Sequence, residues 1–86
     1  MSFKIEISRK VLKFLEKTNK DDVKRILEGI QKLKEPFSIP YEKLKGRSDI
    51  YRIRIGDYRV IYYVDKDNRV VLVLKVDLRE RVYKRF

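Results

Sequence analysis

The sequence contains no cysteine, no histidine and no tryptophan. Without cysteine, disulfides, thiolate nucleophiles and cysteine-ligated zinc are excluded. Without histidine, a serine–histidine–aspartate triad and a histidine-pair nuclease are excluded as well. Several common classes of enzyme site are therefore ruled out before any pattern is considered.

The sequence also lacks a long apolar segment. Its longest apolar run is Val70–Leu74, far shorter than the ~20 residues that a membrane span needs. No apolar signal region is present at the N-terminus. We therefore expect a soluble, cytoplasmic protein with no membrane partner.

The chain is short, with 86 residues, and chains of this size rarely divide. We expect one domain over residues 1–86. About 43% of the residues are apolar, which is enough for one small core. Ordering the chain costs ~1.5 kcal/mol per residue, so most apolar side chains must be buried. Little is left to build a deep cavity, so no cofactor is expected.

Positive charge is what the sequence has in excess. Lysine and arginine number 23 against 13 acidic residues, a net charge of +10. This excess predicts an anionic partner such as nucleic acid, the ribosome or an acidic protein. Eight of the ten arginines lie at or after Arg47. Because arginine makes bidentate contacts with phosphate, we look for function in the second half of the chain.

The first half has the pattern of a strand followed by two helices. Residues 3–7 alternate apolar and polar side chains, as in a half-buried strand. Ser8 can cap a first helix, and Asn19 can cap a second. Apolar residues of the second helix recur at i, i+3, i+4 and i+7 until Pro36 ends it. The short link between the helices predicts an antiparallel hairpin.

The second half has the pattern of a small sheet, so the predicted order is β-α-α-β-β-β. The fold class is α+β, with the helical hairpin packed on a small, mostly antiparallel sheet. The turn at 65–68 opens like a calcium loop but lacks its glycine and distal glutamate, so no metal site is expected. The segments are a loop at 37–46, strands at 50–55, 58–64 and 69–76, and a charged tail at 78–86.

A two-residue turn at Gly56-Asp57 sets the register of the first hairpin, in which Arg54 faces Arg59. Because side chains alternate, Arg52, Arg54 and Arg59 share the face turned away from the core. Two arginines directly opposite each other cost roughly 0.2–1 kcal/mol. We therefore interpret the three as a phosphate socket rather than as charge that only aids solubility. The core face is expected to carry Tyr51, Ile53, Ile55, Tyr58, Val60 and Tyr62.

Two further segments carry candidate site residues. Arg79 and Tyr83 are four residues apart, so they share a face in a helix or in a strand, and Arg81 joins them only in a strand. Tyrosine can stack on a base or donate a proton to an oxyanion. The loop that contains Lys45 and Arg47 lacks the rest of a phosphate-binding P-loop. It is expected to be a flexible basic loop that contacts RNA backbone.

Residues 51–62, Tyr-Arg-Ile-Arg-Ile-Gly-Asp-Tyr-Arg-Val-Ile-Tyr, resemble the central signature of the RelE/ParE toxin superfamily. Leu44-Lys45-Gly46 and the closing Arg79–Tyr83 fit the same pattern, so the resemblance covers nearly the whole chain. It implies a RelE-like, or microbial-RNase-like, fold. The RelE branch implies the toxin of a type II toxin–antitoxin pair: a ribosome-dependent, metal-independent endoribonuclease, or mRNA interferase. The 2′-hydroxyl attacks the adjacent phosphate of mRNA in the ribosomal A site.

The resemblance also implies roles for single residues. Arg59 would hold the scissile phosphate, Arg79 would protonate or stabilise the leaving 5′-oxygen, and Tyr83 would stack on a base. Arg52 and Arg54 stand where the family has two basic residues, often lysines. Arginine effectively cannot lose its proton, so no general base is evident there. The arginines can still stabilise the charged phosphate electrostatically.

The implied partners are a RelB-like antitoxin, acidic or amphipathic, and the ribosome with its mRNA. Apolar residues on a strand edge or on the first helix are expected to dock the antitoxin. Two alternatives stay open. The ParE branch shares the fold but poisons gyrase by binding, without catalysis, and has no need of Arg59, Arg79 and Tyr83. An inactive RNA- or ribosome-binding relative is the other.

Overall fold

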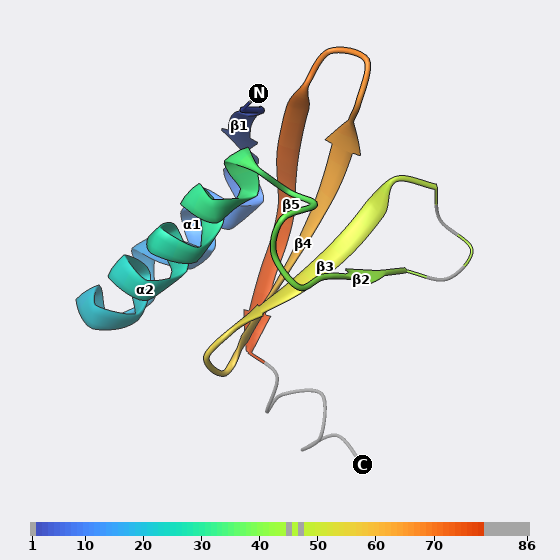
Figure 1. The fold of residues 1–86 in the computed structure, drawn as a ribbon. Coiled ribbons are helices and arrows are strands. Elements are labelled where there is room, and N and C mark those ends of the chain that lie inside the picture. The colour runs from blue at the N-terminus through green and yellow to red at the C-terminus, as the bar shows by residue number, and fades with distance from the viewer. Residues whose placement is uncertain (1, 45, 47, 79–86) are drawn as a thin grey trace.

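A five-stranded sheet with both helices on one of its faces makes up the structure (Figure 1). This computed structural model describes residues 2–44, 46 and 48–78. The α+β class and the predicted order of helices and main strands are confirmed, with one short strand added. The elements are β1 (Lys4–Ile7), α1 (Arg9–Glu16), α2 (Lys20–Gln31), the 3-10 helix η1 (Lys32–Lys34), β2 (Glu42–Lys43), β3 (Ile50–Ile55), β4 (Tyr58–Asp65) and β5 (Val70–Leu78).

Both helices begin at the predicted caps. The Ser8 side chain accepts a hydrogen bond from the backbone N–H of Val11, and Asn19 Oδ1 accepts one from the N–H of Asp22 at 2.9 Å. Each bond satisfies an N–H that has no partner within the helix. After α2 the chain tightens into η1 and leaves helical geometry at Glu35, because the residue before a proline avoids that geometry.

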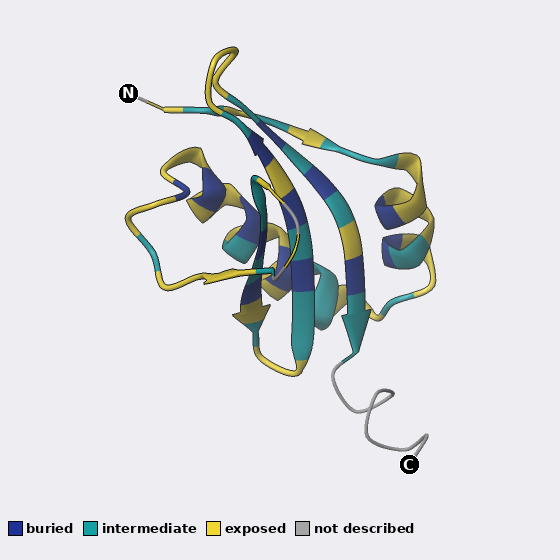
Figure 2. Ribbon diagram, turned by 90° about the vertical axis from the view of Figure 1, so that its right-hand side faces the viewer, coloured by how far each residue is buried: buried dark blue, intermediate teal, exposed yellow. Residues whose placement is uncertain are grey.

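The sheet has the strand order β1-β5-β4-β3-β2, and β1 runs parallel to β5 whereas the other pairs are antiparallel. Dark and light segments alternate along the strands in Figure 2, because only one face is covered by helices. The predicted core face is confirmed for Tyr51, Ile53, Val60 and Tyr62, which are buried, while Ile55 and Tyr58 pack against them partly buried. The remaining buried apolar residues are Val11, Leu15, Ile26, Ile30, Leu33, Val64, Val71, Val73 and Val76.

The register of the β3–β4 hairpin is as predicted, with Arg54 opposite Arg59. Gly56 has a φ of 58°, which glycine adopts without steric cost in a tight hairpin turn. The predicted strand 69–76 is wrong at both ends. Arg69 belongs to the preceding turn, with a φ of 55°, and the strand continues to Leu78. A β-bulge interrupts the β4–β5 pairing between Ile61 and Tyr62.

The predicted loop at 37–46 is only partly a loop, because it contains strand β2. Glu42 pairs with Arg52, and Lys43 pairs with Tyr51, at the edge of the sheet. Just before β2, the rings of Phe37 and Tyr41 each meet Tyr51 edge to face, at centroid distances of 5.6 and 5.3 Å. Aromatic pairs of this kind stabilise beyond the area they bury. They hold the segment against the sheet and so bring β2 to β3. Within the described residues, no helix is both long and apolar enough to cross a membrane.

Candidate functional site

The sheet face turned away from the helices carries Arg52 and Arg54 on β3 and Arg59 on β4. We call this surface the arginine face. Two rows of directly opposed residues cross it. One runs Glu42, Arg52, Ile61 and Lys75, and the other runs Arg54, Arg59 and Asp77. The structure thus brings together the three arginines that the sequence analysis placed on one face.

Glu42 is the contact that sequence reasoning missed. Arg52 Nη2 donates a hydrogen bond to Glu42 Oε2 at 2.8 Å, and Arg54 Nε lies 3.9 Å from Glu42 Oε1. The hydrogen bond from Arg52, with the charges of the three arginines, holds the pKa of Glu42 below its usual value. The arginines therefore have a carboxylate partner within the sheet. The sequence placed Glu42 in a loop, which gave the residue no position opposite Arg52.

The row that contains Arg54 and Arg59 ends in a second carboxylate, that of Asp77. Asp77 on β5 lies directly opposite Arg59, and its Oδ2 is 3.8 Å from Lys75 Nζ. Arg59 therefore has an arginine on one side and an aspartate on the other. The repulsion between facing arginines is partly offset, since opposite charges directly across strands attract. A strand predicted to end at Val76 could not reveal this neighbour.

Two donors on the arginine face are buried without an acceptor among the described residues: the Nε atoms of Arg52 and Arg59. A buried polar atom normally has a hydrogen-bond partner. A guanidinium offers five N–H donors in a planar fork that matches the oxygens of carboxylate or phosphate. Arg52 retains 23% side-chain exposure and Arg54 49%. The face therefore combines two buried donors that have no acceptor among the described residues with arginine side chains that stay partly exposed to solvent.

The other candidate residues, Lys45, Arg47, Arg79, Arg81 and Tyr83, lie outside the described residues. Of these, Lys45, Arg47 and Arg79 each adjoin a described residue on the chain, whereas Arg81 and Tyr83 do not. Leu78, where β5 ends, pairs with Tyr58 of β4, directly after Asp77 pairs with Arg59. Leu78, the residue before Arg79, is therefore one position from Asp77, which lies on the arginine face.

Away from this face, Tyr58 ties the tip of the β3–β4 hairpin to helix α2. Its hydroxyl donates a 2.6 Å hydrogen bond to Asp22 Oδ2. This bond, together with burial, raises the pKa of Tyr58 to about 12, and it lowers the pKa of Asp22. Both groups lie on the helix side of the sheet and do not reach the arginine face. In the part of the chain that is described, no group of three or more acidic, cysteine or histidine residues could hold a metal ion.

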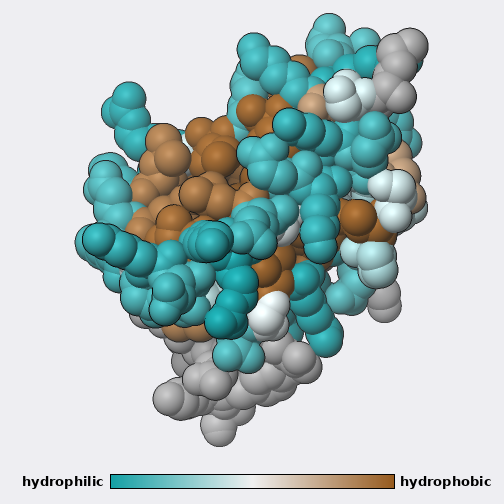
Figure 3. Space-filling model, turned by 60° about the vertical axis from the view of Figure 1, so that its left-hand side comes forward, coloured by the Kyte–Doolittle hydropathy of each residue, from teal (hydrophilic) through white to brown (hydrophobic). Residues whose placement is uncertain are grey.

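The helix side has an apolar surface of its own. Leu12 on α1 is 49% exposed and Leu27 on α2 is 38% exposed. Figure 3 shows apolar side chains gathered there within a polar border. Leu15 and Val23 line the groove between the two helices next to Leu27. The first-helix surface predicted to expose apolar residues therefore does so.

Comparisons with known proteins agree with this architecture. A family model described as the ParE toxin of the type II toxin–antitoxin system parDE matches residues 5–83. A curated protein of Methanocaldococcus jannaschii, named "Putative toxin RelE1", is 40% identical over 90 aligned positions that cover 98% of both chains.

Solved structures match equally widely. The RelE–RelB complex from Pyrococcus horikoshii OT3 contains a chain 37% identical to this one, with a TM-score of 0.80, covering 94% of this chain and 99% of that one. The isolated E. coli RelE toxin is 26% identical, with a TM-score of 0.79, covering 98% of this chain and 94% of that one.

These matches define the class: the chain belongs to the RelE/ParE superfamily, the toxins of type II toxin–antitoxin systems. Within that class it is RelE-like, since the relative at 40% identity and the solved structures at 37% and 26% all carry the RelE name.

Proposed function

We propose that this toxin inhibits translation by cutting mRNA in the ribosomal A site, with the arginine face as the surface that binds the scissile phosphate. The observation that carries the proposal is the pair of buried arginine Nε donors without acceptors among the described residues. Arg52 and Arg59 each lie between two paired strands, which fix the backbone of both residues before a ligand arrives. Preorganised donors of this kind supply much of the rate of phosphate chemistry.

The proposed chemistry is attack of the 2′-hydroxyl on the adjacent phosphate, which forms a cyclic phosphate and releases the 5′-oxygen. Arg59 is proposed to hold the scissile phosphate, and Arg52 and Arg54 to stabilise the added negative charge of the transition state. None of the three can accept the nucleophile's proton, because arginine stays protonated. Their proposed work is positioning and charge stabilisation.

The tail completes the proposed site. Arg79 is proposed to stabilise the negative charge on the leaving oxygen, and Tyr83 to stack on a base next to the cut. Lys45, Arg47 and Arg81 are proposed to contact RNA backbone. Support comes from the end of β5, where Asp77 pairs with Arg59 two residues before Arg79 in the sequence. A metal has no role in this chemistry.

The proposed partner outside the ribosome is a RelB-like antitoxin. Solved relatives include RelE in complex with RelB from Pyrococcus horikoshii OT3 and from Methanococcus jannaschii. The net charge of +10 favours an acidic antitoxin. Leu12 and Leu27 are proposed docking points for an amphipathic segment, because they leave apolar surface exposed on the helices.

A second candidate function is gyrase poisoning without catalysis, which the ParE name of the matching family model favours. That activity would use surface binding and would not need preorganised arginine donors. An RNA- or ribosome-binding protein without activity is the third candidate, because Arg52 and Arg54 cannot act as bases.

One experiment separates the three. The purified toxin is added to a cell-free translation reaction, and the mRNA is mapped by primer extension with and without ribosomes, beside a gyrase supercoiling assay. We expect cuts only when ribosomes are present, and full gyrase activity. Inhibited gyrase with intact mRNA would contradict the proposal and support gyrase poisoning, the second candidate function. Ribosome binding with intact mRNA would favour the inactive relative.

A further inference from the structure

We propose that Glu42 is a built-in competitor of phosphate on the arginine face. In the free toxin the Glu42 carboxylate accepts a hydrogen bond from Arg52 and lies near Arg54. An RNA phosphate must therefore displace this carboxylate before the phosphate can bind both arginines. This inference rests on the proposed function, because it gives a role to a residue beside the proposed phosphate site. Its consequence is that Glu42 limits the affinity of the toxin for RNA.

The Glu42 carboxylate lies at both arginines of β3. Oε2 of Glu42 accepts from Arg52 Nη2 at 2.8 Å, and Oε1 lies 3.9 Å from Arg54 Nε. Each carboxylate oxygen thus addresses a different guanidinium. Carboxylate and phosphate oxygens both accept hydrogen bonds from guanidinium N–H groups. The two anions therefore compete for one set of donors.

The carboxylate is placed so that it can be displaced. Glu42 belongs to a strand of two residues at the sheet edge, and its side chain is 52% exposed. An exposed ion pair contributes little to stability, so its loss does not threaten the fold. The Arg52 side chain, in contrast, is only 23% exposed and lies on β3, which is paired on both sides. An incoming phosphate would therefore move Glu42 and leave the arginine in place.

An alternative role for Glu42 is acceptance of the proton of the 2′-hydroxyl. The contact with Arg52 argues against this role, because it lowers the pKa of Glu42 and makes the carboxylate a weaker base. The same contact keeps Glu42 ionised at neutral pH, as a competitor must be. The two roles predict opposite results for removal of the charge.

The test is the affinity of Glu42→Gln for a short single-stranded 2′-O-methyl RNA, measured by fluorescence anisotropy at low salt. This probe keeps its phosphates but has no free 2′-hydroxyl, so cleavage cannot occur. Glutamine keeps the size and one acceptor oxygen of the side chain. We expect binding tighter by roughly three- to tenfold, because one negative charge beside the phosphate is removed. The gain should shrink as salt screens the charges.

The matched control is Glu16→Gln, the same charge change at an exposed position on α1. A gain equal to that control, or no gain, would overturn the proposal. So would unchanged affinity combined with lost cleavage, the result expected if Glu42 were the proton acceptor. The gain should also disappear in a chain that carries Arg52→Ala and Arg54→Ala, since the competition acts through those arginines.

The binding result is independent of catalysis. If the wild-type toxin leaves mRNA intact on ribosomes, the proposed function fails, yet the anisotropy comparison still decides the role of Glu42. If mRNA is cut but Glu42→Gln binds no tighter than Glu16→Gln, only this inference fails. Melting curves for both variants establish that each chain is folded in the assay.

Discussion

On its helix side the β3–β4 hairpin buries Ile53, Val60 and Tyr62 almost completely, whereas its opposite side carries Arg52, Arg54 and Arg59. The same strands thus build a dry core and a charged surface, because adjacent residues point to opposite faces of the sheet. On the core side the apolar side chains gain from burial. On the arginine side like charges are held together and only partly neutralised by Glu42 and Asp77. Stability is supplied by one face, which leaves the other free to hold charges that bind a ligand.

Substitution of Arg59 should give the largest difference between an effect on cleavage and an effect on stability. Arg59→Ala is expected to lower ribosome-dependent cleavage by about 10²–10³-fold, the usual cost of a preorganised donor to a transition state. Stability should change little, because the variant removes repulsion with Arg54 and attraction to Asp77 together. The measurements are primer extension on translated mRNA and a melting curve.

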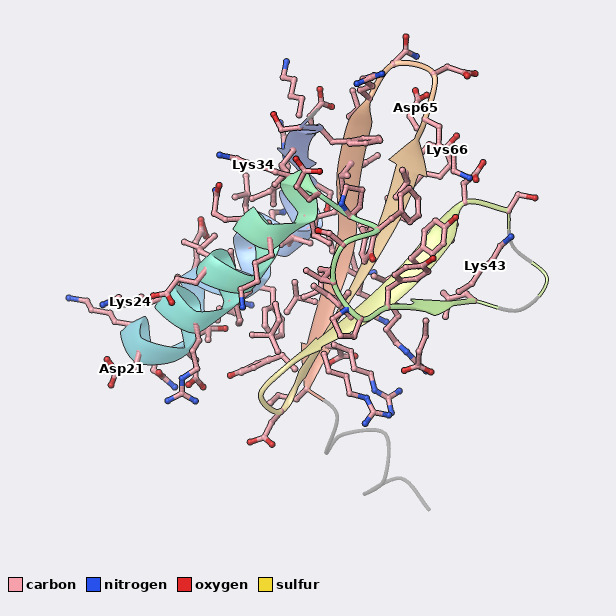
Figure 4. The ribbon with its side chains drawn as sticks, viewed as in Figure 1. Asp21, Lys24, Lys34, Lys43, Asp65 and Lys66 are labelled. Carbon is pink, nitrogen blue, oxygen red and sulfur yellow. The ribbon has the colours of Figure 1, made fainter. Side chains whose placement is uncertain are left out.

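Lys24→Ala is the control for Arg59→Ala, because Lys24 projects from α2 away from the sheet (Figure 4). It removes the same charge and should leave cleavage unchanged. Wild-type cleavage by Arg59→Ala would mean that the arginine face serves only as a soluble surface.

A pair of neighbouring substitutions on β3 tests the division between the faces directly. Ile53→Ala should lower the free energy of unfolding by about 2–4 kcal/mol, because Ile53 is 6% exposed and its loss leaves a cavity. Arg54→Ala should alter stability by no more than ~0.5 kcal/mol, since Arg54 is exposed. Urea unfolding of both variants provides the values. Equal losses would show that the arginine face also contributes to the core.

The ionic-strength dependence of RNA binding measures how many phosphates the arginine face contacts. With three to five contacts, log affinity against log salt should have a slope of roughly −2 to −3.5, from −0.7 per contact on a single strand. Anisotropy of the 2′-O-methyl probe gives this slope. Arg54→Ala should make it shallower by about 0.7. An affinity of the wild-type toxin that does not change with salt would show that the arginine face does not bind phosphate.

The smallest effect is expected at the hydrogen bond between Tyr58 and Asp22 on the helix side. Tyr58→Phe keeps the ring against Phe14 but loses the bond, so stability should fall by about 1 kcal/mol with cleavage unaffected. The folded pKa of Tyr58, about 12, lies above its ordinary value of 10.0. Its contribution is therefore fully present below pH 10 and is lost as pH rises from 10 to 12.

Asp22 gives the opposite dependence on pH. Its folded pKa is lowered from 3.8, so its contribution is present above that pH and is lost on acidification. Thermal melts of wild type and Tyr58→Phe across both ranges would show the difference. Parallel stability curves from acid to alkaline pH would contradict a role for this bond.

Local patterns in the sequence determined the helices, the hairpin and the shared face of the three arginines. Ser8 and Asn19 cap helices through side chains three residues from their partners, and the tight turn at Gly56 aligns Arg54 with Arg59. These interactions join residues close in sequence, so propensity and period are enough to predict them.

Only the tertiary structure decided which carboxylates reach the arginines. Glu42 meets Arg52 because the rings of Phe37 and Tyr41 pack on Tyr51 and bring a two-residue strand to the sheet edge. So short a strand has no period that a sequence could display. The parallel pairing of β1 with β5 and the placement of Asp77 beside Arg59 join distant parts of the chain. Their positions depend on how all the elements pack together, which no local pattern contains.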